Sequence, residues 1–475
     1  MADDAGHEPD DDFREMLRQF LSGNSDIDPA KLAGAAGLPD DPAMVAQLMS
    51  QLQAAMQHQG DGVNWDVALQ QATAIASAES TAVTPTGAAA LDQAVAIASL
   101  WLSEATEISD LTAPPRQLSR IEWVNATMPV WTELAEPVAL SIANSLTEVL
   151  RQQAPEEMSS MIDGASKLMR NVGGTLFAMQ LGQVVGQLSA EVVSGGDIGI
   201  PLLDASSESG LQSAVVPQNV DAFGDGLDIP LDQVQLYLVV RELAHARLFR
   251  HAKWLRLQLM TSITEFARGI RIDTGRLEEL AADFDPSNPE ELRQAMVSGA
   301  LIPPKSDAQL AALERLETML ALIEGWVDVV TAAATTRLPS SAAVAETVRR
   351  RRAAGGPAES AFSTLVGLEL RPRRLREAAA MWQQVTDAVG AERRDALWSH
   401  PDVVPTTADI DDPAAFIARL NAPAPEPDDI DRAIEDLLND DSDDRPHEGD
   451  PAGDSPSDPS GDDSPGSTPG DPEPK

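Results

Sequence analysis

The hydrophobic pattern of the chain is helical over most of its length. From Val63 onward, apolar residues recur every three or four positions, as they do on helices that bury one face. The pattern predicts helices at about 65–75, 89–105, 121–152, 159–193, 231–249, 254–272, 306–336 and 373–389. It ends near Leu420, so we expect a mainly helical domain between residues 61 and 420.

Two short segments have the character of strands. Residues 198–203 and 214–220 are rich in Ile, Leu and Val, and each is interrupted by a proline. They predict a small sheet or hairpin, which makes the fold class mainly α with a minor β part (α+β). The helix at 231–249 follows directly, and its start is marked by Asp228 as a cap and Pro230 as a first-turn proline.

The two ends of the chain differ from this domain. Residues 1–60 mix acidic runs with short helical patterns at 13–21 and 44–56, which predicts a loosely attached N-terminal arm. Residues 421–475 contain 18 acidic and three basic residues among many Pro, Gly and Ser. This composition buries too little apolar surface to offset chain ordering, so we expect a disordered acidic tail. One short helical pattern at 430–438 is suited to docking on a partner or on the domain.

Charge and composition exclude several classes of partner and site. The net charge of −42 would repel nucleic acid and anionic lipid over most of the surface, so nucleic acid is not an expected partner. No stretch has the roughly 18 uninterrupted apolar residues of a membrane span. The acidic N-terminus lacks the pattern of a signal peptide, which predicts a cytoplasmic protein.

The chain has no cysteine, so any metal must be held by His and carboxylate ligands. Nothing in the pattern indicates the oligomeric state.

The predicted helix 231–249 carries three polar residues, Arg241, Glu242 and His245, on an otherwise apolar stretch. Their order, R-E-x-x-H, is one substitution away from H-E-x-x-H, in which two His bind zinc and the Glu acts as general base. Arg241 stands at the position of the first ligand. An equally weighted alternative is a buried Arg241–Glu242 ion pair beside a core histidine bonded to a carbonyl or carboxylate.

A second acidic pair lies on the predicted helix 306–336. Glu324 is the best candidate for a further metal ligand, and Asp328 follows one turn later in the position of a residue that orients a ligand. Charged groups on apolar helix faces need partners. We therefore predict that Arg241, Glu242, His245, Glu324 and Asp328 converge in one buried or half-buried cluster.

The remaining candidates have simpler interpretations. His251 is a weak substitute ligand because it lies on another helix face than His245, and His400 precedes a proline in a predicted loop. The arginine runs 349–352 and 371–376 are expected to be solvated or paired surfaces, with a docking site for the acidic tail as the alternative.

Small residues recur every fourth position along the helix predicted at 159–193, at Gly174, Ala178, Gly182 and Gly186. They indicate close helix packing, and a ligand groove is the less favoured reading.

Three strings carry a resemblance to a known family: Arg-Glu-Leu-Ala-His-Ala-Arg-Leu-Phe at 241–249, Leu-Ile-Glu-Gly-Trp-Val-Asp at 322–328, and the segment 362–377. Over residues 60–420 the chain resembles the zincin-like family of actinobacterial zinc-dependent metalloproteases and hydrolases. The resemblance implies a peptidase-type fold, Glu242 in the general-base position, and His245 and Glu324 in zinc-ligand positions. Arg241 departs from the zincin ligand pattern.

Two functions follow. The first is a zinc-dependent hydrolase of peptides, in which Glu242 activates water on a metal held by His245, Glu324 and one further donor. The second is a non-catalytic relative, a pseudoenzyme that keeps the cleft as a peptide- or protein-binding surface. A permanent cation at position 241 favours the second, because a guanidinium can balance several carboxylates without a metal. The family resemblance favours the first.

Overall fold

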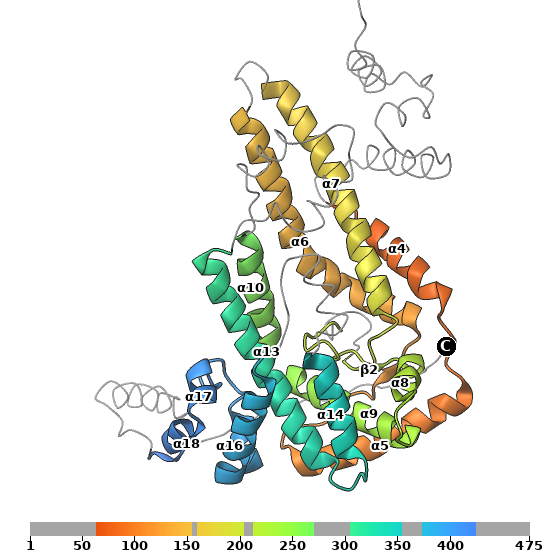
Figure 1. The fold of residues 1–475 in the computed structure, drawn as a ribbon, viewed down its shortest axis with the longest axis vertical. Coiled ribbons are helices and arrows are strands. Elements are labelled where there is room, and N and C mark those ends of the chain that lie inside the picture. Colours follow the sequence, from red (N-terminus) through yellow and green to blue (C-terminus); the bar gives the residue numbers. More distant parts are fainter. Residues whose placement is uncertain (1–62, 154–158, 204–211, 270–304, 354–372, 424–475) are drawn as a thin grey trace, which may run out of the picture. The chain divides into compact units, whose positions relative to one another are not determined.

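The structure, a computed structural model, describes residues 63–153, 159–203, 212–269, 305–353 and 373–423 (Figure 1). The short helical patterns at 13–21, 44–56 and 430–438, and almost the whole of the acidic tail, lie outside these residues. No helix within the described ranges combines the length and the hydropathy that crossing a bilayer requires.

Helices make up most of the described chain, which confirms the mainly helical fold class. They are α4 (Trp65–Ala78), α5 (Pro85–Ala105), α6 (Arg120–Gln153), α7 (Ser159–Leu188), α8 (Pro217–Gly224), α9 (Leu231–His251), α10 (Trp254–Arg268), α13 (Asp307–Ala334), α14 (Ser341–Ala353), α16 (Leu375–Ala396), α17 (Thr407–Asp411) and α18 (Pro413–Asn421). The strands are β1 (Arg116–Gln117) and β2 (Ala214–Val215).

Helix α13 is the central element around which the site forms. It begins where the sequence predicts, because the Ser306 hydroxyl accepts from the backbone of Gln309 and the Gln309 side chain accepts from the backbone of Ser306. It packs against α5, α9, α10, α14 and α16. Helix α9 is almost as enclosed, with every residue from Leu236 to Leu248 buried. Arg241 of α9 and Glu324 of α13 face each other inside the protein.

The predicted small sheet is present, but only one of its two strands, β2, lies in a predicted segment. Strand β2 pairs in parallel with β1, with Arg116 opposite Ala214 and Gln117 opposite Val215. Residues 198–203 form turns instead of a strand, since Gly199 adopts a positive φ of 76° and Pro201 follows it. The second predicted strand ends after Val215, because Pro217 fits the first turn of α8.

Two further sequence predictions concern helix packing and helix starts. A Cβ at Gly182 would lie 2.5 Å from the carbonyl oxygen of Ala68 on α4, so the small-residue face of α7 is a packing face, as predicted. The long helices α6 and α7 also pack side by side (Figure 1). The predicted cap of α9 is wrong: Pro230 itself is the N-cap and no side chain caps this helix.

Candidate functional site

Arg241 and His245 on α9 meet Glu324 on α13 in the protein interior. The Glu324 side chain is fully buried, with 0% of its surface exposed. Arg241 donates through Nη2 to Oε2 of Glu324, and Nε2 of His245 lies 3.2 Å from Oε1 of the same carboxylate. The structure thus brings together three of the five residues that we expected to converge.

The helical register of α9 explains this arrangement. Residues four apart share one helix face, so Arg241 and His245 both point toward α13. The Nδ1 atom of His245 lies 3.2 Å from the carbonyl oxygen of Arg241, one turn earlier. Both ring nitrogens of His245 therefore face oxygen acceptors, which fixes the orientation of the imidazole.

A second arginine reaches the same carboxylate, and the sequence analysis missed it. Arg352, on α14, donates through Nη2 to Oε1 of Glu324 at 2.7 Å. Arg349, one turn earlier on α14, donates to Asp328 at 2.8 Å. The run 349–352 was expected to be a solvated or paired surface. Arg349 is paired and its side chain is 30% exposed, in agreement with that expectation, whereas the guanidinium of Arg352 reaches a fully buried carboxylate.

Asp328 lies beside this cluster, but its carboxylate accepts hydrogen bonds from Arg349 and not from Arg241. It pairs with Arg349, and its charge contributes to the raised pKa of Arg241. Tyr237 lies in the same region, and its buried hydroxyl has no hydrogen-bond partner among the described residues. Burial raises the pKa of Tyr237 to about 12.

The charges of the cluster stabilise one another. Burial alone would raise the pKa of Glu324, but Arg352, Arg241 and His245 hold it well below its usual value. Burial would lower the pKa of Arg241, and its carboxylate neighbours, chiefly Glu324, reverse that effect and raise it. Glu324 is therefore an anion enclosed by cationic and hydrogen-bonding groups.

Glu242 points away from this cluster, toward the chain that follows α7. Its Oε2 accepts from the backbone N–H of Gly196 at 2.8 Å, and its Oε1 accepts from the Ser213 hydroxyl at 2.8 Å and from the N–H of Ala214 at 3.2 Å. The alternative of a buried Arg241–Glu242 ion pair is therefore wrong. Burial raises the pKa of Glu242, although its hydrogen bonds oppose the shift.

Gly196 allows this close approach. A Cβ at position 196 would lie 2.9 Å from the Cβ of His245 and 3.0 Å from Oε2 of Glu242, which is too close for any side chain. The glycine pair Gly195-Gly196 therefore brings backbone directly over the two polar residues of α9. The sequence analysis did not identify this pair as part of the site.

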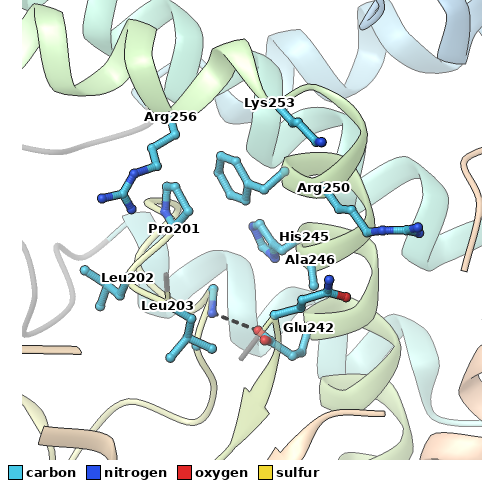
Figure 2. A pocket seen from close by; sticks show the side chains of 13 residues that line it. Pro201, Leu202, Leu203, Glu242, His245, Ala246, Arg250, Lys253 and Arg256 are labelled. Carbon is cyan, nitrogen blue, oxygen red and sulfur yellow. Dashed lines mark hydrogen bonds between the residues drawn. The ribbon is translucent and has the colours of Figure 1, made fainter. Parts of the chain in front are cut away.

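Glu242 and His245 line a pocket of about 430 Å³ (Figure 2). One wall is apolar, and three cationic side chains lie near the junction of α9 and α10. The lining residues are Gly195, Gly196, Pro201, Leu202, Leu203, Gln212, Glu242, His245, Ala246, Phe249, Arg250, Lys253 and Arg256. A cavity of this size, mostly apolar with a few polar groups, is typical of a ligand-binding site.

The remaining histidine candidates take no part in the site. His251 is exposed at the last residue of α9. His400 is also exposed, and its Nδ1 lies 3.3 Å from a carboxylate oxygen of Asp402.

The residues present do not fit a zinc ion. The 3.2 Å between His245 Nε2 and Glu324 Oε1 is compatible with two ligands of one zinc, which lie about 3.3 Å apart in tetrahedral geometry. Both oxygens of Glu324, however, are in contact with permanently charged guanidinium groups. Within the described ranges, no three His, Asp or Glu side chains lie together as a metal-binding group. A dication beside Arg241 and Arg352 would be strongly repelled.

Comparisons with known proteins place the chain in a family. Residues 63–417 match the model of the zincin-like metallopeptidase family. The protein belongs to this family, since the match covers most of the chain. Its structure is similar, with a TM-score of 0.52 and 19% identity, to a crystal structure from Chloroflexus aurantiacus described as a proposed hydrolase with a novel fold. That similarity covers 76% of this chain and 100% of the other, and it shows the fold alone. A search of curated proteins found no match.

Proposed function

We propose that this protein is a peptide-binding member of the zincin-like metallopeptidase family in which a guanidinium group replaces the zinc ion. The observation that carries the proposal is the contact of both Glu324 oxygens with arginines, Arg241 on one oxygen and Arg352 on the other. Arg241 occupies the position of the first ligand in the H-E-x-x-H pattern. Its charge balances a carboxylate that a metal would otherwise balance.

The pocket supports ligand binding without catalysis. Glu242 keeps the general-base position of the pattern and lines the pocket, but its two oxygens accept three hydrogen bonds from the protein. These bonds hold the carboxyl group in place. A peptide is the expected ligand, because the family acts on peptides and the pocket combines an apolar wall with polar groups.

A zinc-dependent peptidase is the second candidate. One observation favours it: Glu242 and His245, separated by the three positions of the H-E-x-x-H pattern, both line the pocket. The two candidates differ in their need for metal and in what happens to a bound peptide.

Metal content and peptide turnover distinguish them. The protein, purified without chelator, should contain far less than one zinc per chain by inductively coupled plasma mass spectrometry. It should bind a fluorescent peptide library equally well with and without EDTA, and the peptides should remain intact by mass spectrometry. Stoichiometric zinc that disappears in His245→Ala and Glu324→Gln, together with cleavage that EDTA abolishes, would establish the peptidase instead.

A pocket-filling variant tests whether binding occurs in the proposed place. Ala246→Phe adds a ring to the wall of the pocket and should abolish peptide binding. Leu257→Phe is the matched control, because Leu257 is 71% exposed on α10 and does not line the pocket. Thermal unfolding of both variants checks that they are folded. Unchanged binding in folded Ala246→Phe would contradict the proposal.

A further inference from the structure

The carboxylate of Glu242 takes the place of one acceptor in a short β-ladder. The chain at Ser194 runs antiparallel to β2 and forms a bridge with Val215. Next to this bridge, the N–H of Gly195 donates to the carbonyl oxygen of Ala214 at 2.9 Å. In a regular antiparallel pair of this kind the two residues exchange both N–H···O bonds. Here the N–H of Ala214 donates to Oε1 of Glu242, at 3.2 Å, so the carboxylate ends the ladder.

The apolar wall of the pocket begins directly after this point. The N–H of Gly199 donates to the carbonyl oxygen of Gly196 and closes a turn, and residues 201–203 then line the pocket. Figure 2 shows these residues across the pocket from Ala246 on α9. The second carboxylate oxygen of Glu242, Oε2, accepts from the N–H of Gly196 at 2.8 Å. Glu242 therefore fixes the start of this wall to α9.

The donors around Glu242 require a carboxylate at this position. Gly196 and Ala214 each donate a backbone N–H to a different oxygen, and the Ser213 hydroxyl donates to Oε1. All three donors are neutral, so these bonds hold backbone and hydroxyl groups and do not form an ion pair. A glutamine has only one acceptor oxygen, and its NH2 group would face one of the two N–H donors. That N–H would then be buried without an acceptor, which is costly.

We propose that Glu242 is a positioning residue, which ends the ladder and holds the apolar wall at the distance from α9 that a peptide side chain needs. The inference rests on the proposed peptide-binding function and assigns a role to the residue in the general-base position. A general base acts on water after the ligand has bound, whereas a positioning residue determines how tightly the ligand binds. The loss of these acceptors should lower the affinity most for a ligand with an apolar side chain.

Fluorescence anisotropy with two labelled pentapeptides measures this role. One peptide has leucine at the centre and glycine elsewhere, and the other is all glycine. The wild type should bind the leucine peptide more tightly. Glu242→Gln should weaken binding of the leucine peptide at least about tenfold, as expected for one unsatisfied backbone group, and should weaken binding of the glycine peptide less.

The outcomes separate this role from the proposed function. Wild-type affinity of folded Glu242→Gln for the leucine peptide would overturn the inference and leave peptide binding intact. An equal loss for both peptides would also overturn it, because the wall would then have no part in the effect. If the wild type binds neither peptide, the proposed function itself is wrong.

Asp395→Asn is the matched control. Asp395 is also a buried carboxylate that accepts from a backbone N–H, that of Glu107, and it lies outside the pocket lining. Both variants should lower the melting temperature, but only Glu242→Gln should change the affinity for the leucine peptide. Equal losses of affinity in the two variants would mean that Glu242 acts through the general stability of the fold, and the inference would fail.

Gly196→Ala tests the same contact from the backbone side, and it decides the question if Glu242→Gln does not fold. An added Cβ would lie 3.0 Å from Oε2 of Glu242, so the methyl group should move the wall while the carboxylate stays. This variant should also weaken binding of the leucine peptide. The double variant should lose no more affinity than the weaker-binding single variant, because both changes act on one contact. Wild-type affinity of Gly196→Ala, or additive losses in the double variant, would contradict the inference.

Discussion

The Nη2 atom of Arg352 lies 2.7 Å from Oε1 of Glu324, the same oxygen that His245 faces at 3.2 Å. Arg352 comes from α14, and His245 comes from α9. One buried carboxylate of α13 thus receives side chains from two other helices. The stability of this region should depend on that charge and on its arginines.

Arg241→Ala should lower the free energy of unfolding by about 3 to 5 kcal/mol, because it leaves the fully buried Glu324 with one fewer cation. Urea denaturation followed by circular dichroism measures the change. The control is Arg337→Ala, whose exposed pair with Glu104 should contribute only about 0 to 1 kcal/mol. A loss for Arg241→Ala as small as that of the control would show that the cluster does not stabilise the fold.

The contribution of Glu324 to stability should depend on pH in a defined direction. Its folded-state pKa is held well below the usual value of 4.5, so below pH 4.5 the unfolded chain takes up this proton more readily than the folded protein does. The stabilisation is therefore fully present above about pH 4.5 and is lost as the pH falls toward the folded-state pKa. The difference in unfolding free energy between the wild type and Glu324→Gln should shrink below pH 4.5. A difference that grows on acidification would contradict this sign.

Gly199 should tolerate alanine poorly, for two reasons. Its φ is 76°, and an added Cβ would lie 2.8 Å from both Arg352 Nη2 and Glu324 Oε1. Gly226 has a similar φ of 78° but nothing within 4 Å of a Cβ, so Gly226→Ala measures the backbone strain alone. That strain should cost about 1 kcal/mol, and Gly199→Ala should cost clearly more. Equal losses in thermal or chemical unfolding would mean that the charged cluster adjusts freely to the methyl group.

Arg241→His should create zinc affinity, because it restores two histidines one helical turn apart opposite Glu324. Arg352 still contacts Glu324 in this variant and should weaken the site. The double variant Arg241→His with Arg352→Gln should therefore bind zinc more tightly than the single variant, at micromolar levels or better. Isothermal titration with zinc measures both. Equal or tighter zinc binding by the wild type would show that Arg241 does not replace the metal.

The sequence predicted those parts of the fold that depend on local periodicity and capping. Helix α13 begins at the capping box of Ser306 and Gln309, and the four-residue spacing of Arg241 and His245 places both on one face. The need of buried charges for partners then indicated Glu324. These are inferences within one helix, or between two helices with unsatisfied charges.

The parts that the sequence did not reveal depend on pairing between distant segments. Arg116 and Gln117 form a strand only because β2 lies beside them, and two residues carry no alternation that a pattern could detect. Arg352 lies in a run of four arginines, of which Arg350 pairs with Glu346 on its own helix. Which arginine faces the interior depends on how α14 packs on α13, and the run itself does not indicate it.

Asp395 has a consequence for how the protein is synthesised. Its carboxylate accepts from the Thr106 hydroxyl, the backbone N–H of Glu107 and Nε1 of Trp326, and it pairs with Arg394. Thr106 and Asp395 are 289 residues apart. At ribosomal rates of about 5 to 20 residues per second, Thr106 waits roughly 15 to 60 s for this partner. Trp326 is made later and lies 69 residues before Asp395, so the part of α13 around it lacks this contact for only about 3 to 14 s. A nascent chain that has not yet reached Asp395 therefore leaves the hydrogen-bond donors of both Thr106 and Trp326 without this acceptor.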